Sequence, residues 1–234
     1  MTHSGVDAVV FDWGGTLTPW HALDPRAAWA AAVSDEELAD RLWQAEIEMW
    51  VRSRDEHRSA TIDEVFVRVG VTPTPAMLDA ISRWWEPHTF LDPDAPLLFD
   101  GLRERGIKIG VLSNTLWTRA EHERIFARDG VLGVFDGAVY TSEIAWTKPH
   151  TEAFRAALDS VGVDDPASAV FVGDRPFDDI HGAKSAGMRA VLVPHSDIPA
   201  DQEGPVRGEA DAIIQRLGDL IDVVDAWAGR TPGR

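Results

Sequence analysis

Four segments of the sequence place a polar or charged side chain directly after, or close to the end of, a short apolar run. Asp12 ends "AVVFD", Ser113 and Asn114 follow "IGVL", Lys148 stands in "WTKPH", and Asp174 ends "VFVGD". Carboxylate, hydroxyl, amide and ammonium groups are side chains that react as nucleophiles or bind phosphate oxygens. Each segment alone is common in turns and helix caps, but the order of all four along one chain is difficult to explain by chance. The segments therefore indicate one site with reactive or phosphate-binding groups.

The apolar runs around these side chains predict the strands of a parallel sheet that is buried on both faces. The predicted strands span residues 7–12, 107–113, 137–142, 169–174 and 189–194. Amphipathic stretches predict helices over residues 95–106, 118–130, 150–162, 179–188 and 209–229. This alternation is typical of an α/β fold with a parallel sheet flanked by helices, in which ligands bind beyond the carboxyl ends of the strands. We therefore expect the four segments to meet at one edge of the sheet.

Residues 18–95 interrupt this alternation, because they contain no convincing strand and read as a series of helices. The interval is far longer than the roughly 12 to 15 residues that a structureless loop normally reaches. We therefore predict an α-helical cap insert over residues 18–95, with residues 1–17 and 96–234 forming the core domain. Its place after the first strand puts the insert above the strand ends, where we expect it to close over the site and set specificity.

Tryptophans are concentrated in and around the predicted insert. Trp43 and Trp50 are seven residues apart and Trp29 lies on the preceding helix, so we expect these rings to form the insert's small core. Trp13, beside Asp12, and Trp20, at the start of the insert, are better placed to face a substrate cleft.

The composition excludes several classes of protein. The 234 residues carry a formal net charge of −17, which disfavours a nucleic-acid or membrane partner, because both need clustered lysine and arginine. The chain contains no cysteine, which excludes thiol catalysis and cysteine-ligated metal sites. The N-terminal residues lack the pattern of a signal peptide and no apolar run is long enough to span a bilayer, so we expect a cytoplasmic protein. The sequence is compatible with a monomer or a homodimer.

The motifs, taken in order, resemble those of a known family. The order D-x-x-G-T, S-N, K-P and G-D-x-x-x-x-D, followed by "GAKSAGM", resembles the haloacid dehalogenase superfamily. The helical insert after the first strand resembles the helical-cap subgroup of that superfamily. The resemblance implies a Rossmann-like core and a Mg²⁺-dependent phosphatase that acts on a small phosphorylated metabolite through an aspartyl-phosphate.

The resemblance also implies a role for each matching residue. Asp12 matches the nucleophile, and Lys148 matches the catalytic lysine that neutralises charge in the transition state. The expected Mg²⁺ ligands are Asp12, the backbone carbonyl of Gly14, Asp174 and Asp179. The groups expected to bind the phosphoryl oxygens are the backbone amide at Gly15 and the side chains of Ser113, Asn114 and Lys148. Asp178 is expected to be the N-cap of the next helix.

Gly14 departs from the common pattern of the superfamily, D-x-D, in which the second aspartate protonates the leaving oxygen and then activates water. Loss of a positioned general acid or base typically costs about 10²- to 10⁴-fold in rate. One reading is therefore a slow phosphatase in which water or a cap residue relays the proton, with His21 and residues 52–58 as candidates. A second reading is a degenerate member that binds a phosphorylated ligand or a protein without turnover.

Two further reactions of the superfamily proceed without the second aspartate. Phosphonoacetaldehyde hydrolases have a similar first motif, but they need a lysine in the cap. The lysines of this chain are Lys108, Lys148 and Lys184, and none lies in the insert. Haloacid dehalogenases bind no metal and resemble S-S-N-x-x-D in the fourth motif, whereas this chain has "GDRPFDD". Dehalogenation therefore stays a weaker alternative to phosphatase activity.

Overall fold

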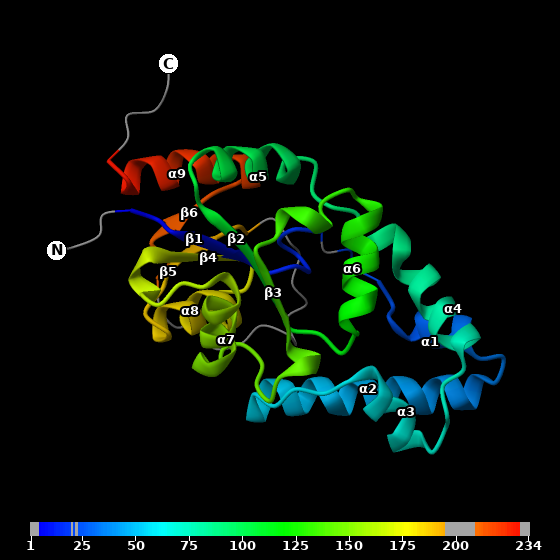
Figure 1. The fold of residues 1–234 in the computed structure, drawn as a ribbon. Helices are drawn as coiled ribbons and strands as arrows, with labels where there is room; N and C mark the ends of the chain where they lie inside the picture. The colour runs from blue at the N-terminus through cyan, green and yellow to red at the C-terminus, as the bar shows by residue number, and fades with distance from the viewer. Residues whose placement is uncertain (1–4, 20, 22, 195–208, 230–234) are drawn as a thin grey trace.

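A parallel sheet of six strands forms the centre of the protein (Figure 1). The computed structural model describes residues 5–19, 21, 23–194 and 209–229. The strand order is β3-β2-β1-β4-β5-β6. The strands are β1 (Ala8–Phe11), β2 (Lys108–Ser113), β3 (Gly137–Tyr140), β4 (Ala169–Gly173), β5 (Arg189–Leu192) and β6 (Ala212–Ile213). The five predicted strands and the Rossmann-like α/β class are confirmed. No helix in the described ranges is long and apolar enough to cross a membrane.

Helices cover both faces of this sheet. They are α5 (Ala95–Glu104), α6 (Arg119–Arg128), α7 (Thr151–Val161), α8 (Gly182–Ser185) and α9 (Leu220–Trp227). In β1, Val9 and Phe11 pack in the layer that contains α5 and α9, whereas Ala8 and Val10 pack in the layer that contains α7 and α8 (Figure 1). All four side chains are 0% exposed. Because helices bury both faces of the sheet, the sequence of β1 is a continuous apolar run.

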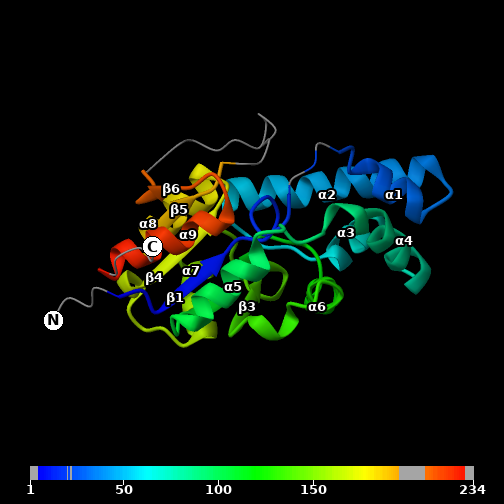
Figure 2. The ribbon, with the colours of Figure 1, turned by 90° about the horizontal axis from the view of Figure 1, so that it is seen from above.

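Four helices lie between β1 and α5 and form a group beside the sheet (Figures 1 and 2). They are α1 (Arg26–Ala32), α2 (Glu36–Glu56), α3 (Ile62–Val69) and α4 (Pro75–Trp85). Trp29 is buried in their shared core against Phe66, and Trp43 packs on the same cluster. Trp50 is 37% exposed, so the prediction that its ring belongs to this core is wrong. The exact bounds of the insert, residues 18 and 95, stay a prediction.

The C-terminal segment differs from the single helix predicted over residues 209–229. Residues Ala212–Ile213 form β6, which pairs with β5, and Ile214 N donates to Leu192 O at 3.0 Å. The helix α9 begins only at Leu220, after a 3₁₀ turn over Leu217–Asp219. The open edge of β5 offers hydrogen bonds to this segment, and that pairing outweighs the helical pattern of the local sequence.

The end of α2 is joined to the core by a short backbone pairing. Arg58 forms an antiparallel bridge with Trp146, and Thr147 N donates to His57 O at 3.0 Å. The next residue along the chain is Lys148. This pairing therefore fixes the insert directly against the segment that carries the predicted catalytic lysine.

Candidate active site

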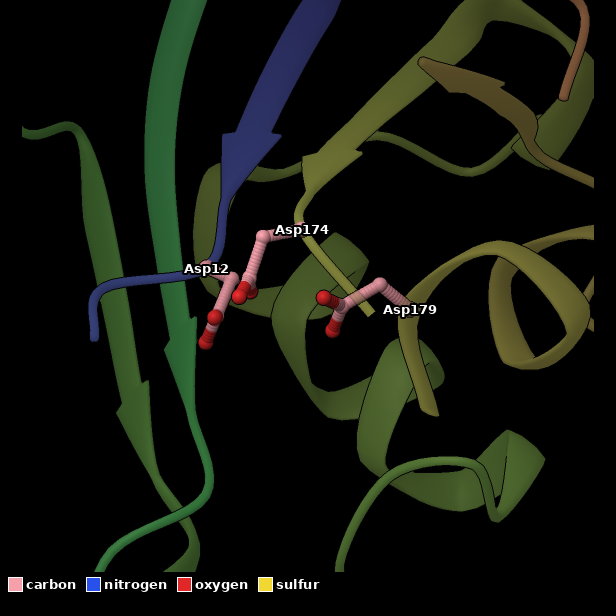
Figure 3. A group of neighbouring side chains, drawn as sticks. All are labelled: Asp12, Asp174 and Asp179. Carbon is pink, nitrogen blue, oxygen red and sulfur yellow. The ribbon is translucent and has the colours of Figure 1, made fainter. Parts of the chain in front are cut away.

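Three aspartates meet beyond the carboxyl ends of the central strands (Figure 3). Asp12 follows β1 and Asp174 follows β4, and these strands are neighbours in the sheet. The Asp12 backbone N donates to Val172 O at 2.9 Å, which holds the end of β1 against β4. Asp179 approaches from the π-helical turn η5 (Pro176–His181). Each aspartate contributes one oxygen to a group whose members lie within 4.8 Å of one another.

Lys148 joins this group through two ion pairs. Its Nζ donates to Asp12 Oδ1 at 2.6 Å and to Asp179 Oδ1 at 2.7 Å, and its side chain is 2% exposed. Burial opposes the charged form of Lys148, but the negative charges of Asp12 and Asp179 outweigh it and raise the pKa of the ammonium above its ordinary value. Lys148 is therefore a fixed positive charge and a poor base at neutral pH.

Ser113 ends β2 and Asn114 directly follows it, as the sequence predicts. The side-chain amide of Asn114 pairs twice with the backbone of Lys148: Nδ2 donates to Lys148 O at 3.1 Å, and Oδ1 accepts from Lys148 N at 2.9 Å. Asn114 thus positions the lysine, a role that the motif by itself does not indicate. The Ser113 side chain is buried, 2% exposed. The phosphoryl contacts expected for both residues stay a prediction.

The carboxylate group has the chemistry of a cation site. Asp174 Oδ2 is buried and has no hydrogen-bond partner among the described residues. Burial and the nearby charges of Asp12 and Asp179 raise the pKa of Asp174 well above its usual range. Burial also raises the pKa of Asp179 to about 6, although Lys148 acts against it. Three carboxylates against one lysine leave an excess of negative charge, and an unpartnered oxygen in such a group fits a divalent cation with oxygen ligands.

A tight turn follows Asp12 and carries the two glycines. Trp13 O accepts from Thr18 N at 3.0 Å, and Gly15 N donates to Thr18 O at 2.8 Å. Gly15 has a φ of +90°, which requires glycine at that position. Its amide is thus already engaged within the turn, and the expected phosphoryl contact of Gly15 stays a prediction.

Thr16, the last residue of D-x-x-G-T, is a contact that the sequence analysis missed. Its Oγ1 donates to Asp174 Oδ1 at 3.4 Å, and the residue is fully buried. Its place at the end of the motif that begins at Asp12 was the available signal.

Asp178 does not cap a helix, so that prediction is wrong. The turn η5 begins at Pro176 with Arg175 at its N-cap position, and Asp178 lies inside it. Burial raises the pKa of Asp178, while Arg175 and Lys148 act in the opposite direction. The early start at Pro176 follows from the fixed φ of proline, which suits the first helical position.

Trp13 has a different place from that predicted, and the role of His21 as a proton relay stays a prediction. Trp13 is 9% exposed and packs against Trp117 and His122, with centroid distances of 5.7 and 4.6 Å, so its ring belongs to the core and does not line a cleft. His21 Nδ1 lies 2.8 Å from His88 Nδ1 in an exposed pair between the first and last segments of the insert. Trp20 lies outside the described residues.

His122, in the aromatic cluster with Trp13, makes stability depend on pH. Burial lowers the pKa of His122 to about 3, so the folded protein keeps the imidazole neutral where the unfolded chain protonates it. The free energy of unfolding should therefore fall by about 1.4 kcal/mol for each pH unit between about 6.5 and 3 on account of this group. Urea unfolding of wild type and His122→Gln at pH 7, 5.5 and 4.5 measures the effect. We expect a shallower decline in the variant, and parallel declines would contradict the prediction.

Comparison with known proteins assigns the sequence to a family. The family model of haloacid dehalogenase-like hydrolases matches residues 6–187. A glyceraldehyde 3-phosphate phosphatase of Methanopyrus kandleri is 29% identical over 232 aligned residues, which cover 94% of this chain and 97% of the relative. A phosphoserine phosphatase of Thermus thermophilus is 29% identical over 226 residues, which cover 97% of this chain and 76% of the relative.

A solved structure has the same fold. The haloacid dehalogenase-type phosphatase of Thermococcus onnurineus superposes with a TM-score of 0.66 at 24% identity, over 94% of this chain and 98% of that protein. The family model covers most of the chain, including Asp12, Asp174 and Asp179, which meet in the buried cluster. The chain therefore belongs to the haloacid dehalogenase-like hydrolase family and is a hydrolase.

Proposed function

We propose that the protein is a Mg²⁺-dependent phosphatase that hydrolyses a small phosphorylated metabolite through an aspartyl-phosphate on Asp12. The observation that carries this proposal is the buried group in which Lys148 bonds both Asp12 and Asp179, while Asp174 Oδ2 has no partner in the described part of the chain. Relatives that align over most of this chain are named for phosphate esters of small metabolites, which supports the substrate class.

Asp12, Asp174 and Asp179, together with the carbonyl of Gly14, would hold the cation. A bound Mg²⁺ supplies positive charge that lets a carboxylate approach a phosphate dianion. Asp12 attacks phosphorus while Lys148, oriented by Asn114, holds a positive charge beside the attacking oxygen. Ser113 and the amides of the turn after Asp12, other than the engaged amide of Gly15, would bind the remaining phosphoryl oxygens.

The buried carboxylates also favour phosphate hydrolysis over dehalogenation and over ligand binding without turnover. Displacement of a halide from carbon by Asp12 requires no cation, and it leaves Asp174 and Asp179 as buried like charges without a function. A protein that only binds a ligand would likewise gain nothing from the mutual repulsion of three buried carboxylates. Both alternatives are outcomes of the experiment that follows.

Phosphate release from a panel of phosphorylated metabolites, which includes glyceraldehyde 3-phosphate and phosphoserine, tests the proposal. We expect release with Mg²⁺, none with excess chelator, and recovery when Mg²⁺ is restored. Asp174→Asn should lower the apparent affinity for Mg²⁺ by about 10- to 100-fold. Losses of this size are typical when a residue that supports the ligands of a metal site is removed. Mg²⁺ should also raise the unfolding temperature of wild type more than that of the variant.

Two results would contradict the proposal. Metal-independent release of chloride from 2-chloropropionate would identify a dehalogenase. Saturable binding of a phosphorylated metabolite with no phosphate release would favour the binding-only member.

A further inference from the structure

His57 occupies an unusual backbone position at the C-terminal end of α2. Its φ of 54° and ψ of 32° are left-handed, and it is the only non-glycine residue with positive φ in the described part of the chain. Helices commonly end in this conformation at glycine or asparagine, because other side chains meet steric resistance there. A bulkier ring is thus retained at a position where glycine would fit with less strain.

The His57 imidazole also carries an unpartnered polar atom. Nδ1 is buried and has no hydrogen-bond partner among the described residues. The ring lies 6.4 Å from that of Phe177 in η5, measured between centroids. Phe177 directly precedes Asp178 and Asp179. A buried donor or acceptor without a partner is unfavourable, and such groups in native proteins call for an explanation such as a ligand or a catalytic role.

The position of His57 relative to the site is fixed by the backbone. His57 O accepts from Thr147 N, and Lys148 is the next residue after Thr147. A second contact from α2 reaches the same place, since Ser53 Oγ donates to Thr147 Oγ1 at 3.1 Å. Arg58 adds a guanidinium contact 4.6 Å from the Trp146 ring centroid. His57 is therefore held beside the segment whose lysine bonds Asp12.

The charges around His57 belong to the same site. The Asp178 carboxyl interacts electrostatically with Arg175, Lys148, Asp12 and His57. Asp178 directly follows Phe177, the residue whose ring lies 6.4 Å from that of His57. From its own helix, Asp55 also interacts with His57. Carboxylates on two elements, α2 and η5, thus lie near the imidazole.

Three other histidines of the core and insert are engaged in contacts away from this place. His122 is fully buried beneath Trp13, and His21 pairs with His88. His150 stacks on Trp146 at 4.0 Å, and its Nδ1 accepts from Glu152 N at the start of α7. Among these residues, His57 combines a buried unpartnered nitrogen with an anchor beside Lys148.

We propose that His57 performs the proton transfers for which the chain has no aspartate at position 14, an inference that rests on the proposed phosphatase function. As the bond from Asp12 to phosphorus forms and the bond to the leaving oxygen breaks, His57 Nδ1 gives its proton to that oxygen. Neutral His57 then takes a proton from water as the water oxygen attacks phosphorus. The bond from phosphorus to Asp12 breaks, inorganic phosphate leaves, and the protonated imidazole and the Asp12 carboxylate are regenerated.

The test compares two leaving groups. Nitrophenolate leaves without protonation, whereas a simple phenolate, with a conjugate-acid pKa of about 10, benefits from an acid. Asparagine tolerates the left-handed conformation, so His57→Asn removes the proton donor and keeps the backbone. With Mg²⁺, we expect His57→Asn to lower kcat/KM for phenyl phosphate about 100-fold, and that for p-nitrophenyl phosphate by less than about threefold. A burst of p-nitrophenol should precede slow turnover, because the aspartyl-phosphate then accumulates.

A double variant supplies the matched control. Gly15 but not Gly14 is among the described glycines with positive φ, so an aspartate at position 14 suits the backbone. Gly14→Asp should restore phenyl phosphate hydrolysis in His57→Asn by more than about tenfold. His57→Gly, which relieves the left-handed strain, should be at least as stable as wild type and show the same selective loss.

The outcomes separate this inference from the function on which it rests. A wild-type protein that hydrolyses neither ester with Mg²⁺ overturns the phosphatase function and the role of His57 together. An active wild type in which His57→Asn affects both esters equally, or neither, overturns the role of His57 alone. Lower stability of His57→Gly with equal losses on both esters would show that the residue is structural.

Discussion

Asp12→Asn should reduce phosphate release by roughly 10⁴-fold or more, because it removes the carboxylate that attacks phosphorus, and the remaining catalytic residues depend on that attack. The fold should survive the change. Asparagine has the same shape, and Lys148 keeps its 2.7 Å bond to Asp179 Oδ1. The substitution also removes one of three buried negative charges that repel one another.

The measurement combines phosphate release with the intact mass of protein quenched during turnover. Wild type should show a species heavier by one phosphoryl group, and Asp12→Asn should show none. Asp164→Asn, an exposed change before the amino end of β4, is the isosteric control and should behave as wild type. Phosphate release by Asp12→Asn at more than a few per cent of the wild-type rate would exclude Asp12 as the nucleophile.

Gly173→Ala should both destabilise the protein and disable the site. A Cβ at Gly173, the last residue of β4, would lie 2.3 Å from Asp179 Oδ2 and 2.5 Å from Asp179 Cβ. Real contacts of this kind are never so close, so Asp179 or the strand must shift. Overpacking in a rigid interior costs about 1–3 kcal/mol. Because Asp179 also bonds Lys148, we expect phosphatase activity and the stabilisation by Mg²⁺ to fall together.

Gly133→Ala is the matched control for this substitution. A Cβ there meets nothing within 4 Å, so its effect on stability should stay within about 0.5 kcal/mol. The test measures the free energy of unfolding in urea and the Mg²⁺-dependent phosphate release of Gly173→Ala and Gly133→Ala side by side. Equal stability and equal activity in both would show that Gly173 does not hold Asp179 in place.

Several features were readable from the sequence because they are imposed by local physics. Strands buried on both faces need apolar side chains at every position, so runs such as "AVVF" identified β1 without knowledge of its neighbours. The strand-end motifs predicted that Asp12, Asp174 and Lys148 would meet, because parallel strands bring their carboxyl ends to one edge.

The errors arose where a residue's environment comes from a distant segment. Residues 212 and 213 are strand because β5 leaves an edge beside them, which no local periodicity records. Trp13 follows the candidate nucleophile in the sequence, yet its ring turns toward Trp117 and His122. Asp178 resembled an N-cap, but the wider turn of η5 begins two residues earlier at Pro176.

The sequence by itself determined the α/β class, the presence of a helical insert and the identities of the groups that carry charge in the site. Only the tertiary structure decided how those groups are used. It shows that Asn114 holds the Lys148 backbone, that Asp174 has an oxygen without a partner among the residues described, and that His57 is anchored beside Lys148. The physical reason is that residue type and spacing follow from local backbone and burial, whereas hydrogen-bond partners and electrostatic neighbours depend on segments that are distant in the chain.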